Sequence, residues 1–151
     1  MIVFVGMMFF YTAFSQTDLP LLNKKVIVYV KSVTGKQVGH GECWDLAKEA
    51  LNYAGAKWDG AYGFGKKLTY GKDKLLPGDI VQFTGVTMEH KEGNSLSRWK
   101  MPKHTAVVYE VKSETDITLA EQNFNNIRRV MLNSYNLNDV KQGTLSFYRP
   151  E

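Results

Sequence analysis

The sequence predicts a single α+β domain, with helices near the N-terminus packed on an antiparallel sheet. Two observations carry this prediction. A clear amphipathic helical pattern precedes the clearest strand patterns, and the strand patterns then follow one another along the chain. Helices first and adjacent strands afterwards is the order typical of α+β folds, whereas α/β folds alternate the two.

The clearest helix follows the only cysteine, Cys43. Its apolar residues fall on one face at helical spacing: Leu46, Ala47, Ala50, Leu51 and Ala54. Gly55 comes next, where a glycine commonly ends a helix. Residues 26–33 are ambiguous, because VIVYV has the propensity of a strand while its apolar spacing, with Gly35 after it, suits a helix. We favour the helix.

Strand patterns occupy the second half of the chain. They are expected at 80–83, after a Pro-Gly turn that Asp79 completes, at 104–111, at 117–124, and in the tail segments 128–132 and 144–150. Residues 56–74, rich in glycine and aromatic residues, are expected to be an irregular connection. Residues 85–103 are expected to form a long polar loop, and such loops in compact domains are often functional.

Size and composition fit one folded domain. The chain has 151 residues, 44% of them hydrophobic and 23% charged, which supports a core without disulfides. The net charge of +4 is mild and its basic residues are scattered, so nucleic-acid binding is not expected. With one cysteine no intramolecular disulfide can form, and we expect a monomer.

The first 14 residues form an uninterrupted apolar run that is shorter than the roughly 20 residues of a membrane-spanning helix. Ala13 and Ser15 then precede a polar stretch, as at a signal-peptidase site. The basic residues that usually begin a signal peptide are lacking, since the run starts at Met1 without a Lys or Arg. We expect 1–15 to be a signal peptide, 16–151 the mature domain, and the protein to be secreted or periplasmic. The alternative is a buried first strand or helix.

Cys43 stands at the start of its helix, after Gly41. Backbone N–H groups and the helix dipole favour a thiolate there, and the same N–H groups can bind an oxyanion. The neighbouring Glu42 carboxylate would raise the pKa of the thiol if it lies close. His104 opens a strand and can face the helix start, as a Cys–His pair requires. The alternatives are a packed cysteine and a surface histidine.

Glu121 and Asn123 fall on one face of the strand expected at 117–124, since side chains alternate along a strand. Either could accept the ring N–H of a histidine and hold its tautomer and orientation.

The segments GECW, PGDIVQF, HTAVVYEV and ITLAEQNF, in this order, resemble the CHAP family of cysteine, histidine-dependent amidohydrolases/peptidases. That family is related to the NlpC-type cell-wall peptidases, and both have a papain-like fold. The resemblance implies that Cys43 is the nucleophile, His104 the base and Glu121 the group that orients it. Asn123 matches the second polar residue of the family's EQN motif. QVGHGECW is also similar to the Q…CW segment of papain-like peptidases, which implies that Gln37 and the Cys43 N–H stabilise the oxyanion.

No metal or cofactor is expected. His40, Cys43 and His104 are suitable ligand types, but the chain lacks a second Cys or a matching second ligand pair. His90 is expected to be solvated. Trp44 could line a substrate groove or belong to the core, and Trp58, Tyr62 and Phe64 are expected to pack. Arg128 and Arg129 are adjacent, so on a strand only one of them could reach a ligand.

These features predict a secreted cysteine amidase or endopeptidase, with a peptide or amide substrate that the resemblance implies is peptidoglycan. Two alternatives use the same residues. One is a binding module that keeps the fold without turnover, and the other is an acyltransferase that passes the acyl group to an amine.

Overall fold

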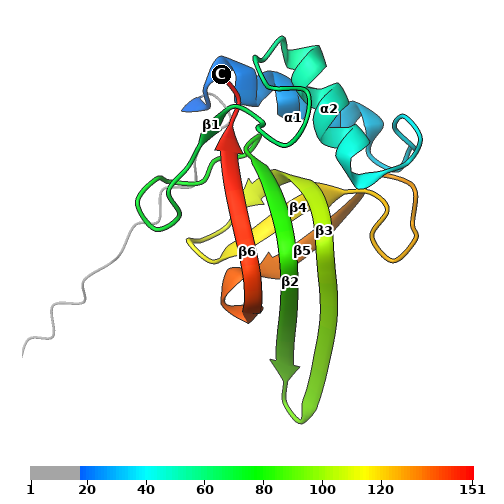
Figure 1. Ribbon diagram of the computed structural model, residues 1–151, viewed down its shortest axis with the longest axis vertical. Helices are drawn as coiled ribbons and strands as arrows, with labels where there is room; N and C mark the ends of the chain where they lie inside the picture. Colours follow the sequence, from blue (N-terminus) through cyan, green and yellow to red (C-terminus); the bar gives the residue numbers. More distant parts are fainter. Residues whose placement is uncertain (1–17) are drawn as a thin grey trace, which may run out of the picture.

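Two helices lie against a six-stranded antiparallel sheet at one end of the molecule (Figure 1). The computed structural model describes residues 18–151, so the expected signal peptide lies outside the described residues. The helices are α1 (Leu21–Val33) and α2 (Cys43–Ala54), and no helix in this range is long and apolar enough to span a membrane. The predicted α+β class is confirmed.

The strands are β1 (Lys66–Lys67), β2 (Ile80–Glu92), β3 (Ser95–Val111), β4 (Asp116–Glu121), β5 (Met131–Asn136) and β6 (Val140–Arg149). A short 3₁₀ helix, η2 (Leu137–Asp139), links the last two. The order across the sheet is β1-β6-β2-β3-β4-β5, so β2 and β3 lie at its centre. Five of these strands overlap regions where strands were expected, with different bounds: β4 ends at Glu121 instead of residue 124, and β5 begins at Met131 instead of 128. Strand β1 lies within residues 56–74, where an irregular connection was expected.

Helical spacing prevails over strand propensity in α1. Val26, Ile27 and Val30 are buried, and Val26 and Val30 pack in one cluster with residues of α2 and the sheet, while Val28 between them is exposed. A helix places these three side chains on one face, whereas a strand would divide them between two faces. In α2 the five predicted apolar residues are all buried, and the Gly55 N–H bonds the carbonyls of Asn52 and Leu51 to end the helix.

The prediction that residues 85–103 form a loop is wrong. They belong to the long β2–β3 hairpin, whose register runs from Ile80↔Val107 to Glu92↔Ser95 around a two-residue turn at Gly93 and Asn94. Figure 1 shows the hairpin extending beyond the rest of the sheet. Val86, Met88 and Met101 are buried along one of its faces, and the polar residues that suggested a loop occupy mainly its solvent side.

The alternation of buried and exposed side chains is interrupted at one place on both strands of the hairpin. Thr84 and Gly85 are consecutive exposed residues on β2, and opposite them Pro102 and Lys103 are consecutive exposed residues on β3. The buried face therefore resumes one residue later on each strand, and the pairing register is unchanged. A sequence search for strict alternation across 80–92 or 95–111 fails at these positions.

Gly143 of β6 packs directly on Gly85. It has φ +87°, and a Cβ added to it would collide with the Gly85 carbonyl. We expect Gly143→Ala to lower the free energy of unfolding by about 2 kcal/mol or more, because overpacking against the Gly85 backbone, which costs roughly 1–3 kcal/mol, adds to the strain of positive φ. Gly93→Ala is the matched control, because Gly93 also has positive φ but nothing within 4 Å of an added Cβ. Equal urea midpoints for the two variants would contradict the packing argument.

Asp79 does more than complete a turn. Its carboxylate is fully buried and accepts hydrogen bonds from the Leu76 N–H, at 2.9 Å, and from Asn23 Nδ2 of α1, at 2.9 Å. Arg149 of β6 binds both carboxylate oxygens, through Nε at 3.0 Å and Nη2 at 2.8 Å. This group joins the first helix, the start of β2 and the last strand.

Candidate active site

The loop before Cys43 is folded tightly around Asp45. Asp45 Oδ2 accepts the N–H groups of His40, at 2.8 Å, and Glu42, at 3.1 Å. Gly39 has φ +54°, and a Cβ there would lie 2.8 Å from Asp45 Cγ. The loop therefore depends on glycine at this position. Cys43 follows this loop as the first residue of α2, and the Cys43 N–H therefore has no acceptor within the helix.

His104 lies on β3 next to Glu121 on β4, since β3 and β4 pair with Val107 opposite Ala120. His104 Nε2 and Glu121 Oε2 are 2.5 Å apart, and both residues are buried. The imidazole lies between the rings of Phe83 and Phe124, with centroids 5.8 and 5.9 Å away. With Nε2 bonded to Glu121, Nδ1 is the ring nitrogen left for the thiol.

Strand β5 holds Glu121 in place. Tyr135 donates its hydroxyl to Glu121 Oε1 at 2.6 Å, and Asn133 donates its amide to the same oxygen at 2.8 Å. Burial, together with the nearby Glu121 carboxylate, raises the pKa of Tyr135, so Tyr135 stays a hydrogen-bond donor. Three donors thus surround a carboxylate that is fully shielded from water.

The Cys43 thiol and the His104 imidazole are close enough for each to shift the pKa of the other. Burial of the thiol raises its pKa, but the His104 hydrogen bond and charge, together with backbone hydrogen bonds from Thr105 and Trp44, lower it by more. Burial lowers the pKa of His104, whereas its bonds to Cys43 and Glu121 and their charges raise it to about 9. Both shifts favour a thiolate–imidazolium pair at neutral pH.

Asn123 does not share a strand face with Glu121, contrary to prediction. The strand has ended, Asn123 has φ 58°, and its amide donates to Glu42 Oε2 at 2.7 Å. Arg128 binds the other Glu42 oxygen at 2.8 Å. Glu42 is thus engaged by an amide and a guanidinium, and Glu121 is the residue in contact with the histidine.

The remaining expected site residues border the loop. Gln37 is exposed, and its amide donates to the Gly39 carbonyl at 3.4 Å. Trp44 is half-buried, lies at a tilt to Trp58 with ring centroids 5.6 Å apart, and donates its indole N–H to the Ala61 carbonyl at 2.6 Å. The roles predicted for Gln37 and Trp44 in oxyanion and substrate binding stay predictions.

Sequence reasoning missed Gln122, which is buried beside the loop that precedes Cys43. Its amide bonds Val38 and Glu42 of that loop. A signal was present: Gln122 lies two residues after Ala120, so strand alternation directs it toward the helices, where a polar side chain needs partners.

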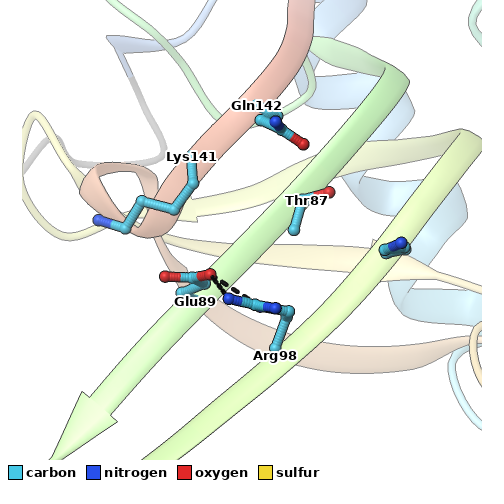
Figure 2. Close-up of a pocket in the computed structure, with 6 residues that line it drawn as sticks. Thr87, Glu89, Arg98, Lys141 and Gln142 are labelled. Atoms are coloured by element: carbon cyan, nitrogen blue, oxygen red, sulfur yellow. Dashed lines mark hydrogen bonds and ion pairs between the residues drawn. The ribbon is translucent and has the colours of Figure 1, made fainter.

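An exposed histidine–aspartate pair and a surface depression lie outside this site. His90 Nδ1 and Asp139 Oδ2 are 2.9 Å apart. Within residues 18–151 no group of three or more His, Cys, Asp and Glu could hold a metal ion. Figure 2 shows a depression of about 340 Å³ on the solvent side of β2, β3 and β6, where Arg98 and Glu89 form an ion pair. It is lined by Thr87, Glu89, Arg98, Lys100, Lys141 and Gln142.

Comparison with known proteins places the site in a family context. Residues 22–151 match the model of the AIM3/BBC1 cysteine proteinase-fold domain. The chain is 34% identical over 138 residues to "Altered inheritance of mitochondria protein 3" of Debaryomyces hansenii, an alignment covering 77% of this chain and 14% of that protein. The chain therefore corresponds to a small part of that relative.

Solved structures show the same fold. A crystal structure of Ly7917 superposes with a TM-score of 0.55 at 18% identity, covering 85% of this chain and 62% of that one. A second, of Ly7917 with the hydrolyzing product of MDP, gives 0.55 at 20% identity with the same coverage. The papain-like fold is confirmed. The family that matches is the AIM3/BBC1 domain, so the finer assignment to CHAP or NlpC is not supported.

Proposed function

The chain belongs to the AIM3/BBC1 cysteine proteinase-fold domain family, and from that premise we propose that it is a cysteine hydrolase acting on a peptide or amide bond. One observation carries the proposal: the buried His104 is hydrogen-bonded to Glu121 and interacts with Cys43, and this interaction lowers the thiol pKa and raises the imidazole pKa. A nucleophile, a base and a group that orients the base are the parts that covalent acyl transfer requires.

The reaction follows from these contacts. The Cys43 thiolate attacks the amide carbonyl carbon, and the carbonyl oxygen becomes an oxyanion beside the Cys43 N–H. The His104 imidazolium gives its proton to the leaving amine, the C–N bond breaks, and a thioester remains. Neutral His104 then takes a proton from water, whose oxygen attacks the thioester, and the acid and the thiolate are released. Glu121 keeps the ring oriented throughout.

The substrate and the location are the finer parts of the proposal. Peptidoglycan is the substrate that the resemblance to CHAP implies, and secretion is what residues 1–15 suggest. The hydrolyzing product of MDP is bound in a structure of Ly7917, and at 20% identity the likeness to that protein supports the fold alone. Both MDP and peptidoglycan are among the substrates to be tried.

Acyl-enzyme formation tests the proposal without a known substrate. We expect p-nitrophenyl acetate to add one acetyl group to the protein, seen by intact mass, at Cys43 and not in Cys43→Ala. Peptides, peptidoglycan and MDP would then be screened for hydrolysis, and added amines would reveal acyl transfer. A wild-type protein that never forms an acyl-enzyme, although it is folded, would instead favour the binding-module alternative.

The rate of hydrolysis should depend on pH in a bell shape. Activity rises as Cys43 loses its proton, at a pH below the ordinary thiol value because its pKa is lowered. Activity falls again as His104 loses the proton it must give to the leaving amine, around pH 9. The measurement is kcat/KM between pH 4 and 11. A profile that still rises beyond pH 10 would contradict a protonated His104 as the acid.

A further inference from the structure

Gln122 makes three hydrogen bonds from a position that is 1% exposed. Its Oε1 accepts the Val38 N–H at 3.1 Å, and its Nε2 donates to the Val38 carbonyl at 2.9 Å and to the Glu42 carbonyl at 2.7 Å. One side chain thus pairs with both backbone groups of Val38, as a neighbouring strand would, and also reaches the residue before the nucleophile.

The bond to Glu42 has a consequence for Cys43, because both belong to one peptide unit. The Glu42 carbonyl and the Cys43 N–H lie in the same plane and point in opposite directions across a trans peptide bond. Two donors hold this carbonyl, Gln122 Nε2 and the Asp45 N–H at 3.1 Å. Fixing the carbonyl fixes the direction of the Cys43 N–H.

We propose that Gln122 is a positioning residue that aims the Cys43 N–H at the oxyanion, by holding the Glu42–Cys43 peptide plane through the Glu42 carbonyl. This inference rests on the hydrolase proposed above, because an oxyanion forms only during acyl transfer. The hydrogen bonds of Gln122 all go to backbone groups of Val38 and Glu42, so it acts through the backbone.

The geometry separates this role from that of Asp45. Asp45 binds the N–H groups of His40 and Glu42 and so folds the loop from the helix side. Gln122 holds the loop from the sheet side, through a side-chain amide that donates to the carbonyl of this peptide unit. Glu121, the last residue of β4, orients His104, and Gln122, the next residue, holds the loop before Cys43. The end of β4 therefore positions both parts of the site.

A single cysteine makes the test direct. Protein labelled with ¹⁵N-cysteine gives one amide cross-peak in a ¹H–¹⁵N spectrum, that of Cys43. We expect Gln122→Met, which keeps the shape and removes the hydrogen bonds, to shift this peak and to slow acylation by p-nitrophenyl acetate roughly tenfold. That loss is a fraction of the about 10²- to 10³-fold cost of removing an oxyanion donor. Alkylation by iodoacetamide forms no oxyanion, so its rate and pH profile should stay as in the wild type.

Asn23→Leu is the control for the loss of a buried amide, since Asn23 is fully buried at the far side of α1 and bonds Asp79. It should lower the melting temperature and leave the Cys43 peak and acylation unchanged. Gln122→Glu, which keeps the acceptor and removes the donors, repeats the test if Gln122→Met does not fold.

Unchanged acylation, or a peak that does not move, overturns the proposal, as does a parallel fall in alkylation and acylation. If the wild type is not acylated at all, the hydrolase proposal fails, and the cross-peak alone decides whether Gln122 positions the amide.

Discussion

Glu121→Gln is expected to lower hydrolysis by about 10³- to 10⁴-fold while the protein stays folded, the range seen when the carboxylate that orients a catalytic histidine is replaced by an amide. The amide oxygen can still accept from Tyr135 and Asn133, so the cavity keeps most of its bonds. The NH₂ group would then face His104 Nε2, which can no longer donate its proton there.

Two contributions that raise the pKa of His104, the hydrogen bond and the charge of Glu121, disappear in this variant. The pKa of His104 therefore falls and that of Cys43 rises, since the thiolate loses its charged partner. Acylation kinetics and an NMR titration of the histidine rings measure both effects. Glu110→Gln, an exposed glutamate on β3, is the control and should behave as wild type. Wild-type acylation in Glu121→Gln would show that Glu121 does not orient the base.

Asp79→Asn is expected to lower the free energy of unfolding by about 3–5 kcal/mol, the range for breaking a buried charge pair by removing one partner. The substitution removes the carboxylate that accepts two hydrogen bonds from Arg149. It also weakens the link between α1 and β6, because Asn23 of α1 bonds the same carboxylate. None of the Asp79 contacts reaches Cys43, His104 or Glu121. The alkylation rate of Cys43 in native buffer should therefore equal that of the wild type.

Urea unfolding followed by tryptophan fluorescence measures the loss. Glu92→Gln at the exposed end of the hairpin is the control, with an expected change within about 0.5 kcal/mol. An Asp79→Asn midpoint equal to this control would contradict the expected cost of removing one partner from a buried charge pair.

Local patterns were enough to predict the helices. In α2 the apolar spacing, the glycine at its end and the burial of the predicted face agree with one another. The triad residues could be proposed because their chemistry is local: a cysteine at a helix start and polar residues at strand positions. The structure brings Cys43, His104 and Glu121 together.

Features that depend on pairing between distant residues were harder to predict. The hairpin at 80–111 was predicted as two short strands, 80–83 and 104–111, joined by a loop, because one face is solvated and the alternation of both strands shifts at the same place. Asn123 was placed on a strand because nothing in ITLAEQNF marks the change to left-handed backbone after Glu121. Gln122 was overlooked since its partners, Val38 and Glu42, are 84 and 80 residues away.

The most direct test of the central claim, an active Cys43–His104 pair, is the rate of Cys43 alkylation by iodoacetamide from pH 4 to 10, read by intact mass. An unperturbed thiol titrates near about 8.5. The structure predicts a midpoint clearly below that value, which rises in His104→Ala because the bond and charge of the imidazolium are lost. A midpoint at or above about 8.5 that is the same in both proteins would contradict the claim and leave a papain-like fold without an activated nucleophile.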